Sequence, residues 1–88
     1  SEMMDINEVI MDLQFDYDQI KMNQVIADTH SISMDLADKV QNLTIKFDEL
    51  DGDSTNDRMT ILDQIKNIYL KQKYVLRLQE SLNKFALL

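Results

Sequence analysis

The sequence contains no proline, and its only glycine is Gly52. An all-β domain needs turn residues about every 8 to 12 positions, whereas this chain has one turn-rich stretch, residues 48–57 (DELDGDSTND). Proline-free segments on both sides of that stretch are compatible with long helices. We therefore expect a single all-α domain in which a loop at residues 48–57 joins an N-terminal arm, residues 3–50, to a C-terminal arm, residues 58–88.

The N-terminal arm carries apolar residues at three- and four-residue spacing, which places them on helix faces. A first seam and a row beside it occupy the start of the arm, and a seam in a different register occupies its end. The first seam is Ile6, Ile10, Leu13, Tyr17 and Ile20; the row beside it is Met4, Met11, Phe15, Met22 and Ile26; the later seam is Leu36, Val40, Leu43, Phe47 and Leu50.

A polar segment at residues 28–33 separates the two seams, and two interpretations of it remain open. The helix either breaks there, with Ser31 or Ser33 capping a new helix, or continues with a shift in register. The absence of glycine and proline favours a continuous helix. A continuous arm gives an antiparallel hairpin of two long helices, and a broken arm gives a three-helix bundle.

The C-terminal arm carries two apolar stripes. The first is Ile61, Leu62, Ile65, Ile68, Tyr69, Val75, Leu76, Leu82 and Ala86; the second is Leu70, Tyr74, Leu78, Phe85 and Leu88. A surface helix of a small domain usually needs one stripe, so this helix is expected to be covered from two sides. We expect another molecule to supply part of that cover, which would place the hairpin in a larger helical bundle.

Charge divides along the same boundary. Residues 1–57 hold 14 acidic residues against three lysines, a net charge of −11, whereas residues 58–88 hold six basic residues against two acidic ones, a net charge of +4. An antiparallel pairing sets the basic arm beside the acidic one, which favours this pairing over one between two acidic arms. Each exposed ion pair contributes only about 0.2 to 1 kcal/mol, so the asymmetry selects the pairing more than it stabilises it.

Composition also indicates in which cellular compartment the protein is expected. The chain has no cysteine, which fits a reducing compartment. Its longest apolar run, residues 85–88, is far shorter than the roughly 20 residues that span a bilayer. The acidic N-terminus lacks the basic region of a signal peptide. We therefore expect a cytoplasmic protein that does not enter a membrane.

The acidic loop resembles a calcium site only in part. Asp51, Asp53 and Thr55 occupy the first three odd positions of an EF-hand-like count. The sixth position is Asn56 instead of glycine, however, and the twelfth is Leu62 instead of the bidentate glutamate. The sequence therefore predicts a turn at this loop, with no metal site.

No residue set has the pattern of a catalytic or cofactor site. The carboxylates of the N-terminal arm fall mainly on polar helix faces, whereas acid–base catalysis needs a desolvated carboxylate in a pocket. The single histidine, His30, has no cysteine near it to complete a metal site or a nucleophile pair. We therefore expect a non-enzymatic protein without cofactor or metal.

The extra apolar rows instead predict a protein–protein interaction module: a small adaptor, an assembly subunit or a chaperone-like partner. Its expected partners are a second copy, a helix of another protein, or both, bound by helix-on-helix burial. The expected contact residues are Met4, Met11, Phe15, Leu70, Tyr74, Leu78, Phe85 and Leu88.

The net charge of −7 disfavours direct binding to nucleic acid, because phosphate neutralisation supplies most non-specific affinity. The same charge supports an alternative function, an acidic inhibitor that mimics nucleic acid and occupies the basic groove of a DNA- or RNA-binding protein.

Overall fold

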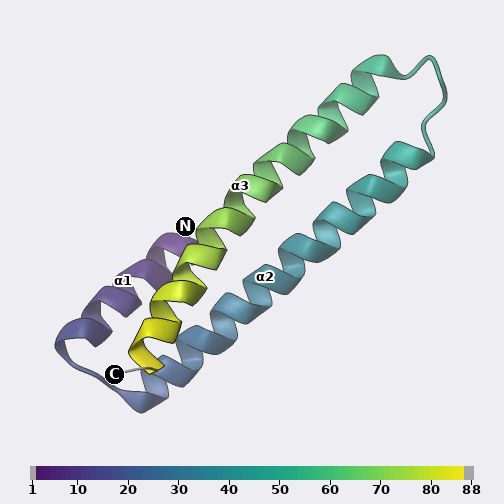
Figure 1. Cartoon of the computed structure of the whole chain (residues 1–88). Coiled ribbons are helices and arrows are strands. Elements are labelled where there is room, and N and C mark those ends of the chain that lie inside the picture. Colours follow the sequence, from purple (N-terminus) through teal and green to yellow (C-terminus); the bar gives the residue numbers. More distant parts are fainter. Residues whose placement is uncertain (1, 87–88) are drawn as a thin grey trace.

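The computed structural model describes the backbone of residues 2–86 and the side chains of residues 5–85, and this range forms three helices without a strand. The helices are α1 (Glu2–Phe15), α2 (Gln19–Asp48) and α3 (Thr55–Ala86). Helices α2 and α3 form a long antiparallel hairpin, and α1 packs against both in the half farthest from the connecting loop (Figure 1). The predicted all-α class is confirmed, and the arrangement is a three-helix bundle that continues as a two-helix hairpin.

The N-terminal arm breaks at residues 16–18, a position that the apolar pattern does not reveal. Asp18 has extended backbone angles, and its carboxylate accepts hydrogen bonds from the N–H groups of Ile20 and Lys21. These bonds satisfy backbone donors that a helix start leaves free. The chain therefore folds back here, and Tyr17 and Ile20, which continue the first seam in the sequence, are exposed.

The break considered near residues 28–33 does not occur, because α2 runs through this segment without interruption. Thr29 is only 1% exposed, and its hydroxyl donates a hydrogen bond of 2.7 Å to the carbonyl oxygen of Val25. A threonine hydroxyl that is bonded to its own helix can be buried without an unsatisfied polar group. The polar segment therefore passes through the core as a helix.

The loop between α2 and α3 lies where the sequence predicts a turn. The carbonyl oxygen of Ser54 accepts the first helical bond of α3, from the N–H of Arg58. The Arg58 side chain reaches back across the loop and donates a hydrogen bond of 3.0 Å to the carbonyl oxygen of Leu50. This contact joins the end of α2 to the start of α3.

The core is concentrated where all three helices meet. Its buried apolar residues are Ile6, Ile10, Leu13, Met22, Val25, Ile32, Leu36, Ile68, Val75, Leu78 and Leu82. Nearer the loop, where only α2 and α3 pair, the facing residues Leu43, Phe47, Leu50, Ile61 and Ile65 are half-buried. The hairpin is therefore well packed at one end and thinly packed at the other.

Candidate protein interaction surfaces

The structure separates the eight contact residues predicted from the sequence. Leu78 is 4% exposed and belongs to the core, and Tyr74 and Phe85 pack against that core. This part of the second stripe is thus covered by the chain's own core, to which α1, α2 and α3 all contribute. Leu70, like Met11 and Phe15 of α1, is exposed. The side chain of Met4 and all of Leu88 lie outside the described residues.

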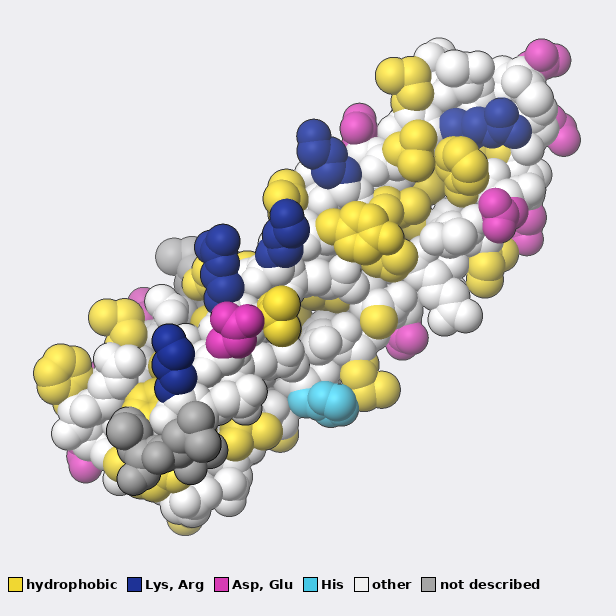
Figure 2. All heavy atoms as spheres, viewed as in Figure 1, with side chains coloured by type: hydrophobic (Ala, Val, Ile, Leu, Met, Phe, Trp, Pro, Cys, Tyr) yellow, Lys and Arg dark blue, Asp and Glu magenta, His cyan; other side chains and the backbone are white. Residues whose placement is uncertain are grey.

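Helix α3 presents a second set of apolar side chains that sequence reasoning assigned to the covered face. Leu62, Tyr69 and Leu76 are between 51% and 54% exposed, and Ile65 beside them is half-buried. Their spacing of three, four and seven residues places them on one helix face. We call these four residues the α3 stripe. In Figure 2 hydrophobic side chains gather on this part of the hairpin, with Lys and Arg side chains nearby.

The α3 stripe is bordered by positive charge. Lys66, Lys73 and Arg77 are exposed, and at about 100° per residue they lie next to the stripe on its outer side. We call these three residues the basic row. An amphipathic helix with acidic residues along one edge would be complementary to this surface.

A groove runs between α2 and α3 on the other side of the hairpin, near the loop. Two contiguous hollows of about 540 and 520 Å³, which share Leu43, Lys46 and Gln64, make up this loop-end groove. Its lining residues are Lys39, Asn42, Leu43 and Lys46 of α2, Glu49 and Leu50 just after α2, and Asp57, Thr60, Ile61, Gln64, Asn67, Ile68 and Lys71 of α3. Leu62 and Tyr69 each lie two residues from a groove residue, about 200° around α3, so the groove and the exposed part of the α3 stripe lie on different sides of the hairpin.

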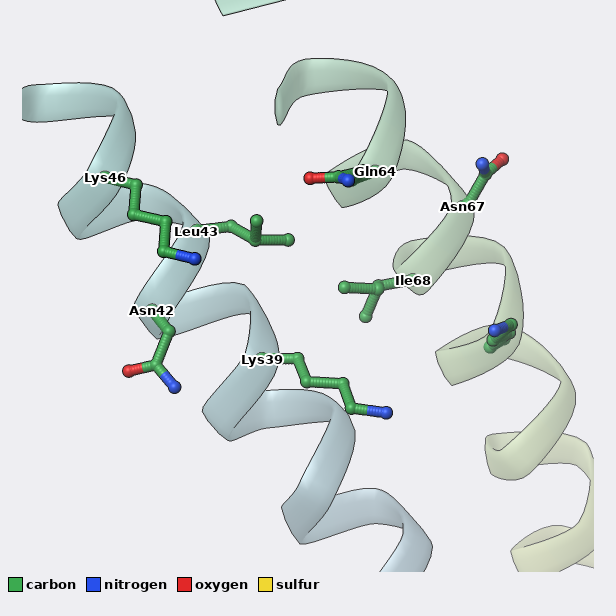
Figure 3. Close-up of a pocket in the computed structure, with 8 residues that line it drawn as sticks. Lys39, Asn42, Leu43, Lys46, Gln64, Asn67 and Ile68 are labelled. Atoms are coloured by element: carbon green, nitrogen blue, oxygen red, sulfur yellow. The ribbon is translucent and has the colours of Figure 1, made fainter. Parts of the chain in front are cut away.

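The inner part of the loop-end groove is basic in an otherwise acidic protein. Figure 3 shows Leu43 and Ile68 pointing toward one another between the helices, with the side chains of Lys39 and Lys46 extending over this apolar floor. Lys71 lines the groove from α3, and no carboxylate lines this inner hollow. The three lysines give it a local positive charge that opposes the net charge of the chain.

At the other end of the bundle, the 16–18 connection closes over α3. The rings of Tyr17 and Phe85 lie 6.5 Å apart between centroids and are tilted by 40°, within the range of favourable aromatic pairs. Together with Leu13 and Ile26 they line a hollow of about 590 Å³. This contact anchors the turn between α1 and α2 to the end of α3.

Among the described residues, no group of three or more His, Asp or Glu side chains is placed to hold a metal ion. Over the same range, none of the helices is both long and apolar enough to cross a bilayer. The α3 stripe and the loop-end groove are the candidate interaction surfaces.

The sequence contained part of the signal for these surfaces. The first stripe of the C-terminal arm contains Leu62, Tyr69 and Leu76 together with Ile61, Ile68 and Val75. This stripe is wider than α1 and α2 can cover entirely. The groove lysines gave no such signal, because Lys39 and Lys46 lie far from Lys71 in the chain.

Comparisons with models of protein families, with curated proteins and with solved structures find no match to this chain.

Proposed function

We propose that this protein is a non-enzymatic interaction module, a small adaptor, assembly subunit or chaperone-like partner, that binds an amphipathic helix of another protein on its α3 stripe. The observation that supports this function is the α3 stripe, in which Leu62, Tyr69 and Leu76 remain about half exposed after folding and Ile65 is half-buried. A partner helix with apolar residues at matching spacing would bury this set.

The basic row indicates the chemistry of that partner. Lys66, Lys73 and Arg77 lie along one edge of the stripe, so a helix with Asp or Glu along the facing edge would be attracted and oriented. Apolar burial supplies most of the affinity, and the charges affect mainly the rate of association and the direction of the helix.

The test is affinity capture from cells that make the protein, with Leu62→Asp/Leu76→Asp as the binding-site variant and Met34→Asp as the matched control. Met34 is exposed on α2, so its substitution introduces one carboxylate, against two in the binding-site variant, on a different face. We expect a partner that the wild type and the Met34 variant retain and the double variant loses. Partners that the double variant retains would contradict the proposal.

Salt dependence separates this function from the alternative of an acidic nucleic-acid mimic. Apolar helix docking persists at high salt, whereas a mimic that occupies a basic groove would be released steeply as salt is raised. At 1 M salt the Debye length is about 3 Å, so attraction between exposed charges is largely screened. Retention of the captured partner at this salt concentration therefore supports helix docking.

A further inference from the structure

Helix α1 and the loop-end groove lie on the same side of the hairpin, one after the other. The groove between α1 and α2 is lined on α2 by Lys21, Gln24 and Asp28, and the loop-end groove is lined by Lys39, Asn42 and Lys46. Each residue of the second set follows its counterpart by 18 residues, about five helical turns. The surface that α1 covers therefore continues beyond the start of α1 as an open groove.

The open groove matches α1 in length. Helix α1 has 14 residues and is about 21 Å long at 1.5 Å per residue. The groove extends along α2 from Lys39 to the end of the helix at Asp48, about 15 Å, and continues to Leu50. A helix of the size of α1 would complete a third layer along the whole hairpin.

The outward side of α1 carries two apolar side chains beside Glu8, and among the described residues both apolar side chains are left exposed. Phe15 is 91% exposed and Met11 about half exposed, and both lie about 200° around the helix from the buried Leu13. The groove offers the complementary floor, because Leu43, Leu50 and Ile61 are only half-buried. Both apolar surfaces would be removed from water by one contact.

The outer side of α1 and the inner part of the loop-end groove also carry opposite charges. Helix α1 carries Asp5, Glu8 and Asp12 as exposed carboxylates. Asp5 and Asp12 line its groove with α2, so the acidic edge of α1 lies on the α2 side. In the inner part of the loop-end groove, two of the three lysines, Lys39 and Lys46, also lie on α2, whereas the outer part is lined by Glu49 and Asp57.

We propose that two copies of the chain associate face to face and antiparallel, each placing the outer side of its α1 in the loop-end groove of the other. A two-fold axis that crosses the hairpin near the start of α1 forms both contacts at once, as an isologous interface requires. In this register Phe15 lies opposite Leu50 and Ile61, and Glu8 lies beside Lys39 and Lys46. This inference goes beyond the proposed function, because it leaves the α3 stripe on the outside of the dimer.

A charge-swap experiment tests this interface by light-scattering chromatography across a range of protein concentrations. We expect the wild type to be a dimer. The variants Glu8→Lys and Lys39→Glu/Lys46→Glu should each form weaker dimers, with a dissociation constant at least about tenfold higher than that of the wild type. Mixing the two variants should restore a dimer containing one copy of each, since both contacts then pair opposite charges. Restoration by mixing also shows that both variants are folded.

Apolar substitutions provide the second arm of the test. Phe15→Glu should weaken the dimer, whereas Ile20→Glu should not, although Ile20 is also apolar, 80% exposed and close in sequence. A wild-type monomer at all concentrations, failure of the mixture to form a dimer, or a dimer that only Leu62→Asp disrupts would each overturn the inference. A monomer would leave the proposed function standing, because the partner helix binds a different side of the hairpin.

Discussion

The guanidinium carbon of Arg58 lies 5.8 Å from the centre of the Phe47 ring, so the first turn of α3 rests on the last turn of α2. The same side chain donates its hydrogen bond to the Leu50 carbonyl oxygen. A cation over an aromatic ring contributes about 0.5 to 1 kcal/mol at exposed sites. The Nε atom of Arg58, however, is buried without a partner, which offsets part of the gain.

Arg58→Ala should therefore lower the free energy of unfolding by about 1 to 2 kcal/mol. The measurement is urea denaturation followed by circular dichroism at one protein concentration. Arg77→Ala is the matched control, because Arg77 is exposed on the same helix. Equal stabilities for the two variants would show that the Arg58 contacts do not hold the loop.

Asp18 determines where α2 begins. Asp18→Ala removes the acceptor for the N–H groups of Ile20 and Lys21 and should cost about 1 kcal/mol of stability. Asp18→Asn keeps an acceptor oxygen and should stay close to the wild type. Asp16→Ala, a change two residues away outside the cap, should also have little effect in the same denaturation experiment. An effect of Asp16→Ala as large as that of Asp18→Ala would argue against a specific cap.

Leu70 and Leu78 were predicted from the sequence to share one contact stripe, but the structure gives them different roles. Leu78→Ala should cost about 2 to 5 kcal/mol, because it leaves a cavity among α1, α2 and α3. Leu70→Ala, at a position more than half exposed, should change stability by less than about 0.5 kcal/mol. Thermal unfolding of both variants measures the difference. Similar losses would mean that Leu70 is also buried within the chain.

Gly52 is not required by the geometry of its turn. No glycine in the described range has a positive φ, and a Cβ atom at Gly52 would meet no atom within 4 Å. Gly52→Ala should therefore stabilise the protein by about 0.4 to 1 kcal/mol, by restricting the unfolded chain. A higher urea midpoint with an unchanged slope is the expected result. A lower midpoint would indicate that the loop uses a conformation which only glycine adopts easily.

The sequence was sufficient for the fold class and for the loop because both depend on residue types with few alternatives. A proline-free chain with one turn-rich segment leaves little besides long helices, and α2 and α3 flank the predicted loop. Helix α3 contacts both α1 and α2, whereas its cover by another molecule stays a prediction.

The break at residues 16–18 could not be located from apolar spacing. Tyr17 and Ile20 continue the seam of Ile6, Ile10 and Leu13 at the correct intervals, so a periodic pattern persists where the helix ends. The informative residue is Asp18, whose side chain caps α2. The sequence alone does not distinguish Asp16 and Asp18 from the other acidic residues of this arm, so it does not predict the cap.

The position of the break also decides which surfaces of the protein stay uncovered. Apolar spacing does not show that α1 folds back onto α3, so the sequence alone predicts that a partner covers Tyr74, Leu78 and Phe85. Once α1 folds back, its own outer side and the groove beyond it become the uncovered surfaces. Their relation depends on tertiary structure, since Glu8 and Lys46 are distant in the chain.

Because α1 covers one half of the hairpin, backbone amides along α2 and α3 are unequally protected from hydrogen exchange. Around Leu43 and Ile61 the helices lack a third layer, so local unfolding there exposes less apolar surface than unfolding near Val75. The loop end can therefore open and close while the bundled end stays folded. A molecule that covers the loop end would slow exchange there first, and that protection would mark its position along the hairpin.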